Sequence, residues 1–352
     1  MLALLSAAAL PVVLAGSVSG AGAADPLAGQ QQPLRIMHVD RALHRAGHLR
    51  DVRVLIADTG LDLGHPDLRG RLFRLGRATR APDSGGYYGG HPPTIPAGGH
   101  GWDLLGTDAP PNVIPDADPS DPAGGSGHGT AVAGILGAAR NNGEGGRGVA
   151  PNARFVALRT CWDGDQCYQY LQPDAFDWAA KRGVRVVSLS WLADFDAAVR
   201  SSIARHPGVL FVTIPSGNGG TFNADPTDPF PCGLKLANVL CVSTSSPGGG
   251  LDCGAYGPHV VDVAVPTRDN VTTVNGGGFA RGTGCATSWA APTAAGLATI
   301  LFGMNPNASP AQVKRAIIGG AHPSPAWKGR SISGGIADGL GSVRALQRMR
   351  GG

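Results

Sequence analysis

The chain has 352 residues, of which 42% are hydrophobic and 15% charged, and it contains 55 glycines and 28 prolines. This balance is typical of a globular protein with many tight turns and excludes a disordered, collagen-like or linker protein. The net charge of +4 is spread along the chain without a run of five basic residues, so we expect no nucleic-acid partner.

The N-terminus is uncharged from Leu2 to Ala24, and its apolar stretch is followed by small residues that offer an A-x-A cleavage site. This pattern predicts a signal peptide over residues 1–24, with an uncleaved anchor as the alternative. We therefore expect a secreted or extracytoplasmic protein. Residues 25–38 are predicted to be a short N-terminal segment, followed by one domain over residues 39–349.

Apolar, β-branched runs alternate with helical patterns along the rest of the chain. The predicted buried strands cover residues 52–57, 155–158, 184–189, 209–214 and 239–242. The predicted helices cover residues 129–139, 173–182, 197–205, 288–304 and 310–318, the last with Ser309 as its N-cap. Residues 76–127 lack periodicity and are predicted to be loop. Such alternation indicates an α/β fold with a parallel sheet covered on both faces.

Six cysteines, an even number, agree with export to an oxidising compartment. Cys161 and Cys167 are close in sequence, as are Cys232 and Cys241, and both pairs are predicted disulfides. Reduced core thiols in a cytosolic protein are the alternative. The spacings lack the matching histidine pair of a zinc site.

Two polar residues stand at places where α/β proteins carry chemistry. Asp58 ends the first predicted strand, at the carboxyl edge of the sheet, although such an aspartate alone is more often a cap or turn former. His128 stands between two glycines at the start of a small-residue helix, where a lone histidine is more often structural.

Two further residues complete this set. Ser288 begins a buried helix, near backbone N–H groups, and in isolation it reads as an ordinary N-cap. Asn218 follows the strand at 209–214, in a sequence that also fits an Asn-Gly turn.

The combination favours nucleophilic catalysis. A serine hydroxyl needs a base to take its proton, and that base needs an acid to orient it. The order Asp58, His128, Ser288 differs from that of α/β-hydrolases, and the chain has neither G-x-S-x-G nor H-E-x-x-H.

These motifs resemble those of the subtilisin-like serine protease family (subtilases, peptidase S8 type) over residues 39 to 341. The matching segments are Ala57-Asp58-Thr59-Gly60 with Asp62 and His65-Pro66-Asp67-Leu68, Gly127 through Gly134, Gly148-Val149-Ala150-Pro151, and Ala286 through Pro292, where Ala286 replaces a glycine. The resemblance implies a three-layer subtilisin-like α/β fold with a mostly parallel seven-stranded sheet and helices on both faces.

The resemblance also implies roles. Ser288 would attack the peptide carbonyl, His128 would act as general base and then acid, and Asp58 would orient His128. Asn218 and the Ser288 backbone N–H would form the oxyanion hole. The family topology brings Cys253 and the loop before Ser288 to the same end of the sheet, which implies a third disulfide, Cys253–Cys285.

The substrate edge departs from the family. Where relatives read Ser-Leu-Gly, this chain reads Ser190-Trp191-Leu192, and we expect Leu192 to narrow one pocket. With Gly217, these are the predicted substrate-binding residues. The family usually carries a folding pro-domain, and only about fifteen residues lie between Ala24 and Val39.

No cofactor is expected to take part in the chemistry and no metal site is assigned. Asp116, Asp118 and Asp121 could hold a structural calcium ion, but Asp-Pro and Asp-Ala turns explain them as well. His44 and His48, spaced i,i+4 on a predicted helix, are better explained as a solvated face than as metal ligands.

The predicted function is a serine endopeptidase, a monomer that acts on protein or peptide substrates. The first alternative is a transpeptidase or macrocyclase, in which an amine instead of water resolves the acyl-enzyme. The second is a catalytically silent binding module.

Overall fold

The computed structural model describes residues 22–83, 91–106, 114–122, 124–162, 167–192, 194–227 and 229–349. Nearly all of the predicted signal peptide or anchor lies outside these residues. Within the described part of the chain, no helix is both long enough and apolar enough to cross a membrane.

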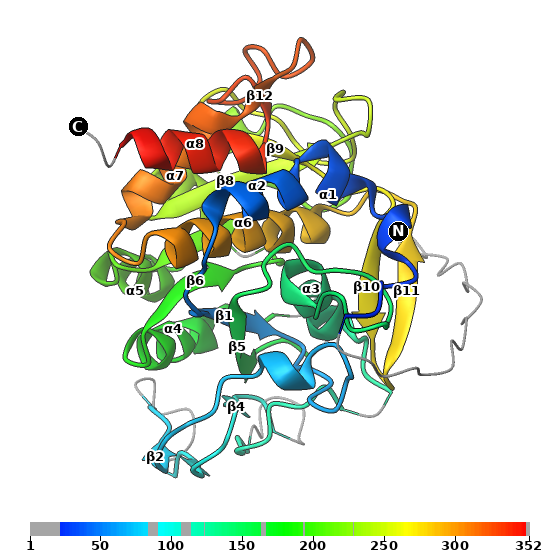
Figure 1. Ribbon diagram of the computed structural model, residues 1–352. Helices are drawn as coiled ribbons and strands as arrows, with labels where there is room; N and C mark the ends of the chain where they lie inside the picture. Colours follow the sequence, from blue (N-terminus) through cyan, green and yellow to red (C-terminus); the bar gives the residue numbers. More distant parts are fainter. Residues whose placement is uncertain are drawn as a thin grey trace.

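The central sheet has the strand order β12-β13-β9-β8-β7-β6-β1-β5-β4 (Figure 1). Its strands are β1 (Val52–Asp58), β4 (Gly101–Asp103), β5 (Ala153–Arg159), β6 (Val184–Ser188), β7 (Leu210–Thr213), β8 (Val239–Ser245), β9 (Val263–Pro266), β12 (His322–Pro323) and β13 (Gly335–Ile336). The seven strands from β9 to β4 all pair in parallel. The predicted fold class is therefore confirmed, with the short strands β13, parallel, and β12, antiparallel, added at one edge.

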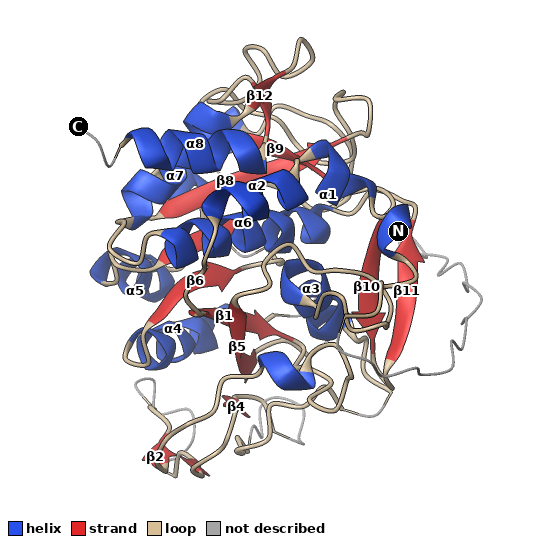
Figure 2. Ribbon diagram, viewed as in Figure 1, coloured by secondary structure: helices blue, strands red, loops and turns tan. Residues whose placement is uncertain are grey.

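Helices cover both faces of this sheet (Figure 2). The α-helices are α1 (Gln32–Ile36), α2 (Val39–Ala46), α3 (His128–Gly137), α4 (Gln172–Ala180), α5 (Ala197–Arg205), α6 (Ala290–Met304), α7 (Pro310–Gly320) and α8 (Gly339–Arg348). Helices α2, α3, α6, α7 and α8 pack on one face, and α4 and α5 pack on the other.

Strand β1 shows why this arrangement buries so much apolar surface. Val54 and Ile56 point into the core under α6, whereas Leu55 and Ala57 point into the core under α4. Because neighbouring side chains of a strand point to opposite faces, a strand covered on both faces must be apolar at nearly every position.

The predicted helix at 288–304 is divided in the structure. A short 3₁₀ turn, η6 (Thr287–Trp289), precedes α6, which starts at Ala290. Helix α7 begins as predicted: Ser309 Oγ accepts a hydrogen bond from the Gln312 N–H at 3.2 Å, and Gln312 Oε1 accepts one from the Ser309 N–H at 2.8 Å.

Two sequence-based predictions were wrong in part. Residues 76–127 are not all loop, because β4 lies among them and pairs with β5, and Trp102 of β4 is fully buried. Three residues are too few to show a strand's period. Among the predicted pair of helical histidines, only His44 lies on α2, because the helix ends before Gly47, and His48 follows it.

Residues 25–38 pack against the domain. A short 3₁₀ turn, η1 (Ala28–Gln30), and α1 lie in this segment. The buried carboxylate of Asp25 accepts hydrogen bonds from the N–H groups of Asn141 and Asn142, at 2.7 and 2.9 Å, and pairs with Arg147. The segment is therefore anchored to the loop that follows α3.

The two ends of the domain meet on the α2 side of the sheet (Figure 1). Helix α8 packs against α2 and α7. His38 Nδ1 lies 2.7 Å from Asp338 Oδ2, and the Gly339 N–H donates to the Met37 carbonyl at 2.7 Å.

All three predicted disulfides are present: Cys161–Cys167, Cys232–Cys241 and Cys253–Cys285. Three disulfides indicate an extracytoplasmic protein. The remaining elements include the hairpin β10 (Asn270–Val274) and β11 (Gly278–Gly282), the pair β2 (Thr79–Arg80) and β3 (Thr94–Ile95), and the 3₁₀ turns η2 (Arg69–Arg71), η3 (Gln169–Leu171), η4 (Asp225–Thr227) and η5 (Cys232–Leu234).

Candidate active site

Asp58 is the last residue of β1, at the carboxyl edge of the parallel sheet. Its side chain is almost fully buried, and Oδ1 accepts hydrogen bonds from its neighbour's backbone, Thr59 N–H, at 2.8 Å and from His128 Nδ1 at 2.7 Å. A buried carboxylate held in this way can fix the orientation of an imidazole ring.

His128 is the first residue of α3, and its neighbouring glycines bring it to Asp58. A Cβ at Gly129 would overlap the carbonyl oxygen of Gly60 and lie 3.1 Å from Asp58 Cβ, so only glycine lets the helix start this close to β1. Gly127 has a φ of 68°, in the left-handed region that favours glycine. The Gly129 N–H also donates to Thr59 Oγ1 at 3.0 Å, which ties the helix start to the strand end.

Ser288 lies in η6, immediately before the buried helix α6. The alanine that replaces the family glycine, Ala286, has φ −143° and ψ 124°, an extended conformation that any L-residue adopts. Its methyl group therefore causes no backbone strain in the turn before Ser288.

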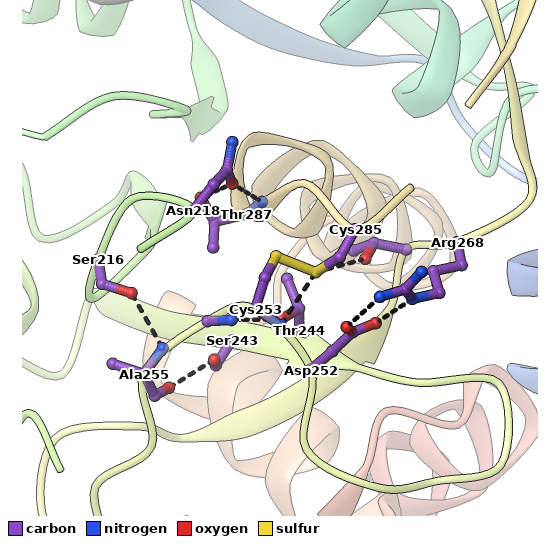
Figure 3. The surroundings of a disulfide bond; sticks show 12 residues. Ser216, Asn218, Ser243, Thr244, Asp252, Cys253, Ala255, Arg268, Cys285 and Thr287 are labelled. Atoms are coloured by element: carbon purple, nitrogen blue, oxygen red, sulfur yellow. Dashed lines mark hydrogen bonds and ion pairs between the residues drawn. A yellow bond between two sulfur atoms is a disulfide. The ribbon is translucent and has the colours of Figure 1, made fainter. Parts of the chain in front are cut away.

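Asn218 is held by the residue that precedes Ser288. Asn218 Oδ1 accepts hydrogen bonds from the Thr287 N–H at 2.8 Å and from Thr287 Oγ1 at 2.9 Å. Because a backbone N–H can only donate, the atom facing Thr287 must be the amide oxygen. Figure 3 shows the amide nitrogen of Asn218 pointing away from Thr287. The amide nitrogen is therefore the group that Asn218 can present to a substrate.

One cleft of about 300 Å³ brings most of the predicted site residues together. It is lined by His128, Ser190, Trp191, Leu192, Ile214, Gly217, Asn218, Thr287 and Ser288. Asp58 lies behind His128, outside the cleft lining. The sequence reasoning did not single out Thr287 and Ile214; Thr287 could have been found from its place beside Ser288.

The Ser190–Leu192 wall of this cleft combines buried and exposed side chains. Trp191 is buried and its indole N–H donates to the Ala57 carbonyl at 3.2 Å, so this side chain supports the end of β1. Leu192 is 45% exposed, and a Cβ added to Gly217 would lie 3.6 Å from Leu192 Cδ1. The Leu192 side chain therefore reaches across the cleft toward Gly217.

Trp289 is a further residue that the sequence reasoning left without a role. Its ring lies almost parallel to the His128 imidazole, with the ring centroids 5.7 Å apart and 19° between the planes. Both rings line a second hollow of about 730 Å³ beside the β10–β11 hairpin. The imidazole thus borders two cavities, one containing Ser288 and one bounded by the hairpin.

The candidate calcium ligands do not converge on one point. Asp116 Oδ1 accepts from the Asp118 N–H, and Asp118 Oδ1 accepts from the N–H and hydroxyl of Ser120, so both carboxylates stabilise turns. Asp121 instead accepts from Thr59 Oγ1 at 3.0 Å, and burial raises its pKa. For Asp116 and Asp118 these hydrogen bonds favour the turn explanation. A structural calcium ion, which the sequence allows but does not assign, is not tested by these contacts.

One other group of side chains brings three candidate metal ligands close together. Among the described residues, the only such group is formed by Asp252, Cys253 and Cys285. Both sulfurs are engaged in a disulfide, so this group is not a metal site.

The sequence profile of the subtilase family (Peptidase_S8) matches residues 50–339. The chain is 28% identical over 257 residues to the thermophilic serine proteinase of Bacillus sp. strain AK1, covering 72% of this chain and 53% of that protein. It is 28% identical over 261 residues to thermitase of Thermoactinomyces vulgaris, and this match covers 73% of this chain and 77% of thermitase.

The fold also matches a solved structure, a protease from Pseudoalteromonas arctica, with a TM-score of 0.72 and 22% identity. The match covers 92% of this chain and 99% of the other. The aligned region spans about half the length of the Bacillus relative, 53%, and about three quarters of thermitase, 77%.

Proposed function

The chain belongs to the subtilase family, and on that basis we propose that it is a secreted serine endopeptidase that hydrolyses peptide bonds through an acyl-enzyme on Ser288. The observation that carries the proposal is the 2.7 Å contact between Asp58 and His128, together with a cleft that His128 shares with Ser288 and Asn218.

In the first half of the proposed reaction, Ser288 Oγ attacks the carbonyl carbon of the peptide bond while His128 Nε2 accepts the hydroxyl proton. Asp58 holds Nδ1 and stabilises the imidazolium that forms. The Asn218 amide nitrogen and the Ser288 N–H donate to the developing oxyanion. His128 then gives its proton to the leaving amine, and the C–N bond breaks.

In the second half, water attacks the acyl-enzyme with His128 as base, and the carboxylic acid product leaves with Ser288 restored. Every group in these steps belongs to this chain or is water. The three disulfides support secretion, and the proposed domain covers residues 39–349 after an N-terminal segment that packs on it.

The test combines labelling with a nucleophile variant. A fluorophosphonate probe should label Ser288, and Ser288→Ala should lose both labelling and peptide hydrolysis. Nucleophile removal in the relative subtilisin costs about a million-fold in kcat, which sets the expected scale. Equal circular dichroism spectra of the two proteins would show that the fold survives.

Three outcomes would contradict the proposal. Labelling at another serine would remove Ser288 from its role, and no labelling with intact fold would favour the binding module. Mass spectra showing ligated instead of hydrolysed peptides would favour the transpeptidase.

A further inference from the structure

The disulfide between Cys253 and Cys285 is shown in Figure 3. Cys285 stands three residues before Ser288 in the sequence, at the start of the turn that carries Ser288. The Cys285 sulfur also accepts a hydrogen bond from the Cys253 N–H at 3.1 Å. The turn carrying Ser288 is therefore joined covalently to residues 252–256, which we call the brace loop.

The brace loop also pairs with the loop that carries Asn218. The Gly220 N–H donates to the Cys253 carbonyl at 3.1 Å, and the Ala255 N–H donates to Ser216 Oγ at 2.9 Å. Asn218 stands midway between these two contacts. Further along, the Tyr256 N–H donates to the Phe222 carbonyl at 2.9 Å, and Tyr256 O accepts from the Ala224 N–H at 2.7 Å.

The brace loop is itself fixed to the sheet. The Gly254 N–H donates to Thr244 Oγ1 at 2.8 Å, and Ser243 Oγ donates to the Ala255 carbonyl at 2.5 Å, both from β8 (Figure 3). Asp252 forms a two-pronged ion pair with Arg268, with both N···O distances 2.7 Å. Because these contacts hold the brace loop in one place, it can fix the position of the turn carrying Ser288 relative to the loop carrying Asn218.

We propose that the Cys253–Cys285 disulfide and the brace loop are positioning elements that set the place of the Asn218 amide relative to Ser288. The proposal rests on the function assigned to Ser288 above. Donors that stabilise an oxyanion must lie within a few tenths of an ångström of their place, and a 1 Å displacement can cost about a hundredfold in rate.

A direct link between the two partners limits the expected effect. Thr287 donates two hydrogen bonds to Asn218 Oδ1 whether or not the disulfide exists. Removing the disulfide should therefore loosen the pair without separating it. We expect a fall of about tenfold in kcat, well below the full loss of one oxyanion donor.

The principal variant is Cys253→Ser with Cys285→Ser. The matched control is Cys232→Ser with Cys241→Ser, which removes a disulfide between η5 and β8 whose two cysteines lie outside both loops. We expect the first pair to lower kcat about tenfold with KM unchanged, and to weaken binding of a peptide aldehyde by the same factor. Binding of the matching peptide alcohol should not change, and the control should keep wild-type kcat.

The experiment separates a positioning role from a purely structural one. Melting curves of both variants are recorded, and kinetics are measured well below each Tm. A 253/285 variant with wild-type kcat, or with a loss equal to that of the control, would overturn the proposal.

A second variant keeps the proposal testable if the first fails to fold. Ser216→Ala removes the hydrogen bond to the Ala255 N–H and leaves the disulfide intact. It should lower kcat a few-fold with KM unchanged, and an unchanged kcat would overturn the proposal.

Fluorophosphonate labelling of the wild type is run in parallel. A wild type that is not labelled at Ser288 overturns the endopeptidase and the positioning role together. If the wild type is labelled at Ser288 and the 253/285 variant is labelled and active to the same degree as the wild type, only the positioning role is overturned.

Discussion

The turn carrying Ser288 and the Ser190–Leu192 wall face each other across one cleft, but they are held in different ways. The turn is joined to the brace loop by a disulfide and to Asn218 by two hydrogen bonds. In the opposite wall, the Ser190 hydroxyl is buried without a hydrogen-bond partner in the described structure, and Leu192 is 45% exposed.

The difference separates two tasks. Reacting groups must be placed accurately before the substrate arrives, because rate depends steeply on their geometry. A wall that recognises side chains needs shape, and one leucine that projects from it can change that shape without moving the turn opposite. We therefore expect substitutions in the first region to act on kcat and those in the second to act on substrate choice.

The largest effect that sharpens this comparison is expected for Asn218→Ala. Loss of one oxyanion donor should lower kcat by about a hundredfold to a thousandfold with little change in KM. Steady-state kinetics on one peptide substrate measure both values. Asn223→Ala, in the same loop, serves as the control. A raised KM with normal kcat would place Asn218 in ground-state binding instead.

A smaller and different effect is expected for Leu192→Gly. Removing the side chain that reaches toward Gly217 opens the cleft, so peptides with a large residue on the acyl side should gain about 10- to 100-fold in kcat/KM relative to those with alanine. Peptide-library profiling measures this ratio. Ile332→Ala, an exposed site elsewhere on the surface, is the control. An unchanged profile would show that Leu192 does not limit the pocket.

The smallest effect is expected at Asp67, which belongs neither to the turn carrying Ser288 nor to the Ser190–Leu192 wall, and it concerns the pH dependence of stability. Burial raises the pKa of this carboxyl to about 6, against a hydrogen bond from Asn142 Nδ2 that lowers it. Because the pKa of this carboxyl is higher in the folded protein than in the unfolded chain, where it is near 4, protonation stabilises the folded state. This stabilisation is fully present below about pH 4 and is lost as the pH rises through about 6.

Asp67→Asn should therefore remove a decline in Tm between about pH 4 and pH 6, leaving a higher Tm than wild type at neutral pH. Thermal melts across this range measure the difference, with the exposed Asp194→Asn as control. If Tm declines by the same amount in the wild type and in Asp67→Asn, the decline does not come from Asp67 and the prediction is wrong. Activity at Ser288 should be unaffected, which distinguishes this site from both walls.

The fold was predictable where the physical signal extends over several residues. Strand β1 is apolar at nearly every position because it is covered on both faces, and this pattern is legible in sequence. Strand β4 cannot be predicted from the sequence in the same way. Its three residues are too few to show an alternating pattern, and its pairing with β5 depends on the rest of the sheet.

The candidate site shows the same limit at the scale of single residues. Asp58, His128, Ser288 and Asn218 stand in motifs whose order and chemistry carry information. The stacking of Trp289 on His128 depends on how two side chains from separate elements turn toward each other, which no local pattern encodes. The expected shape change at Leu192 was predictable only as a departure from the Ser-Leu-Gly pattern of relatives.

The meeting of α2 with α8 has a consequence for biosynthesis. The contact of His38 with Asp338 spans 300 positions, so α2 lacks its contact with α8 until residues 339–348 have left the ribosome. Closing so distant a contact is slow because chain entropy is lost before the contact forms. We expect a nascent chain that is still attached to the ribosome, or stretched through a translocation channel, to remain open on this side of the sheet until α8 docks on α2.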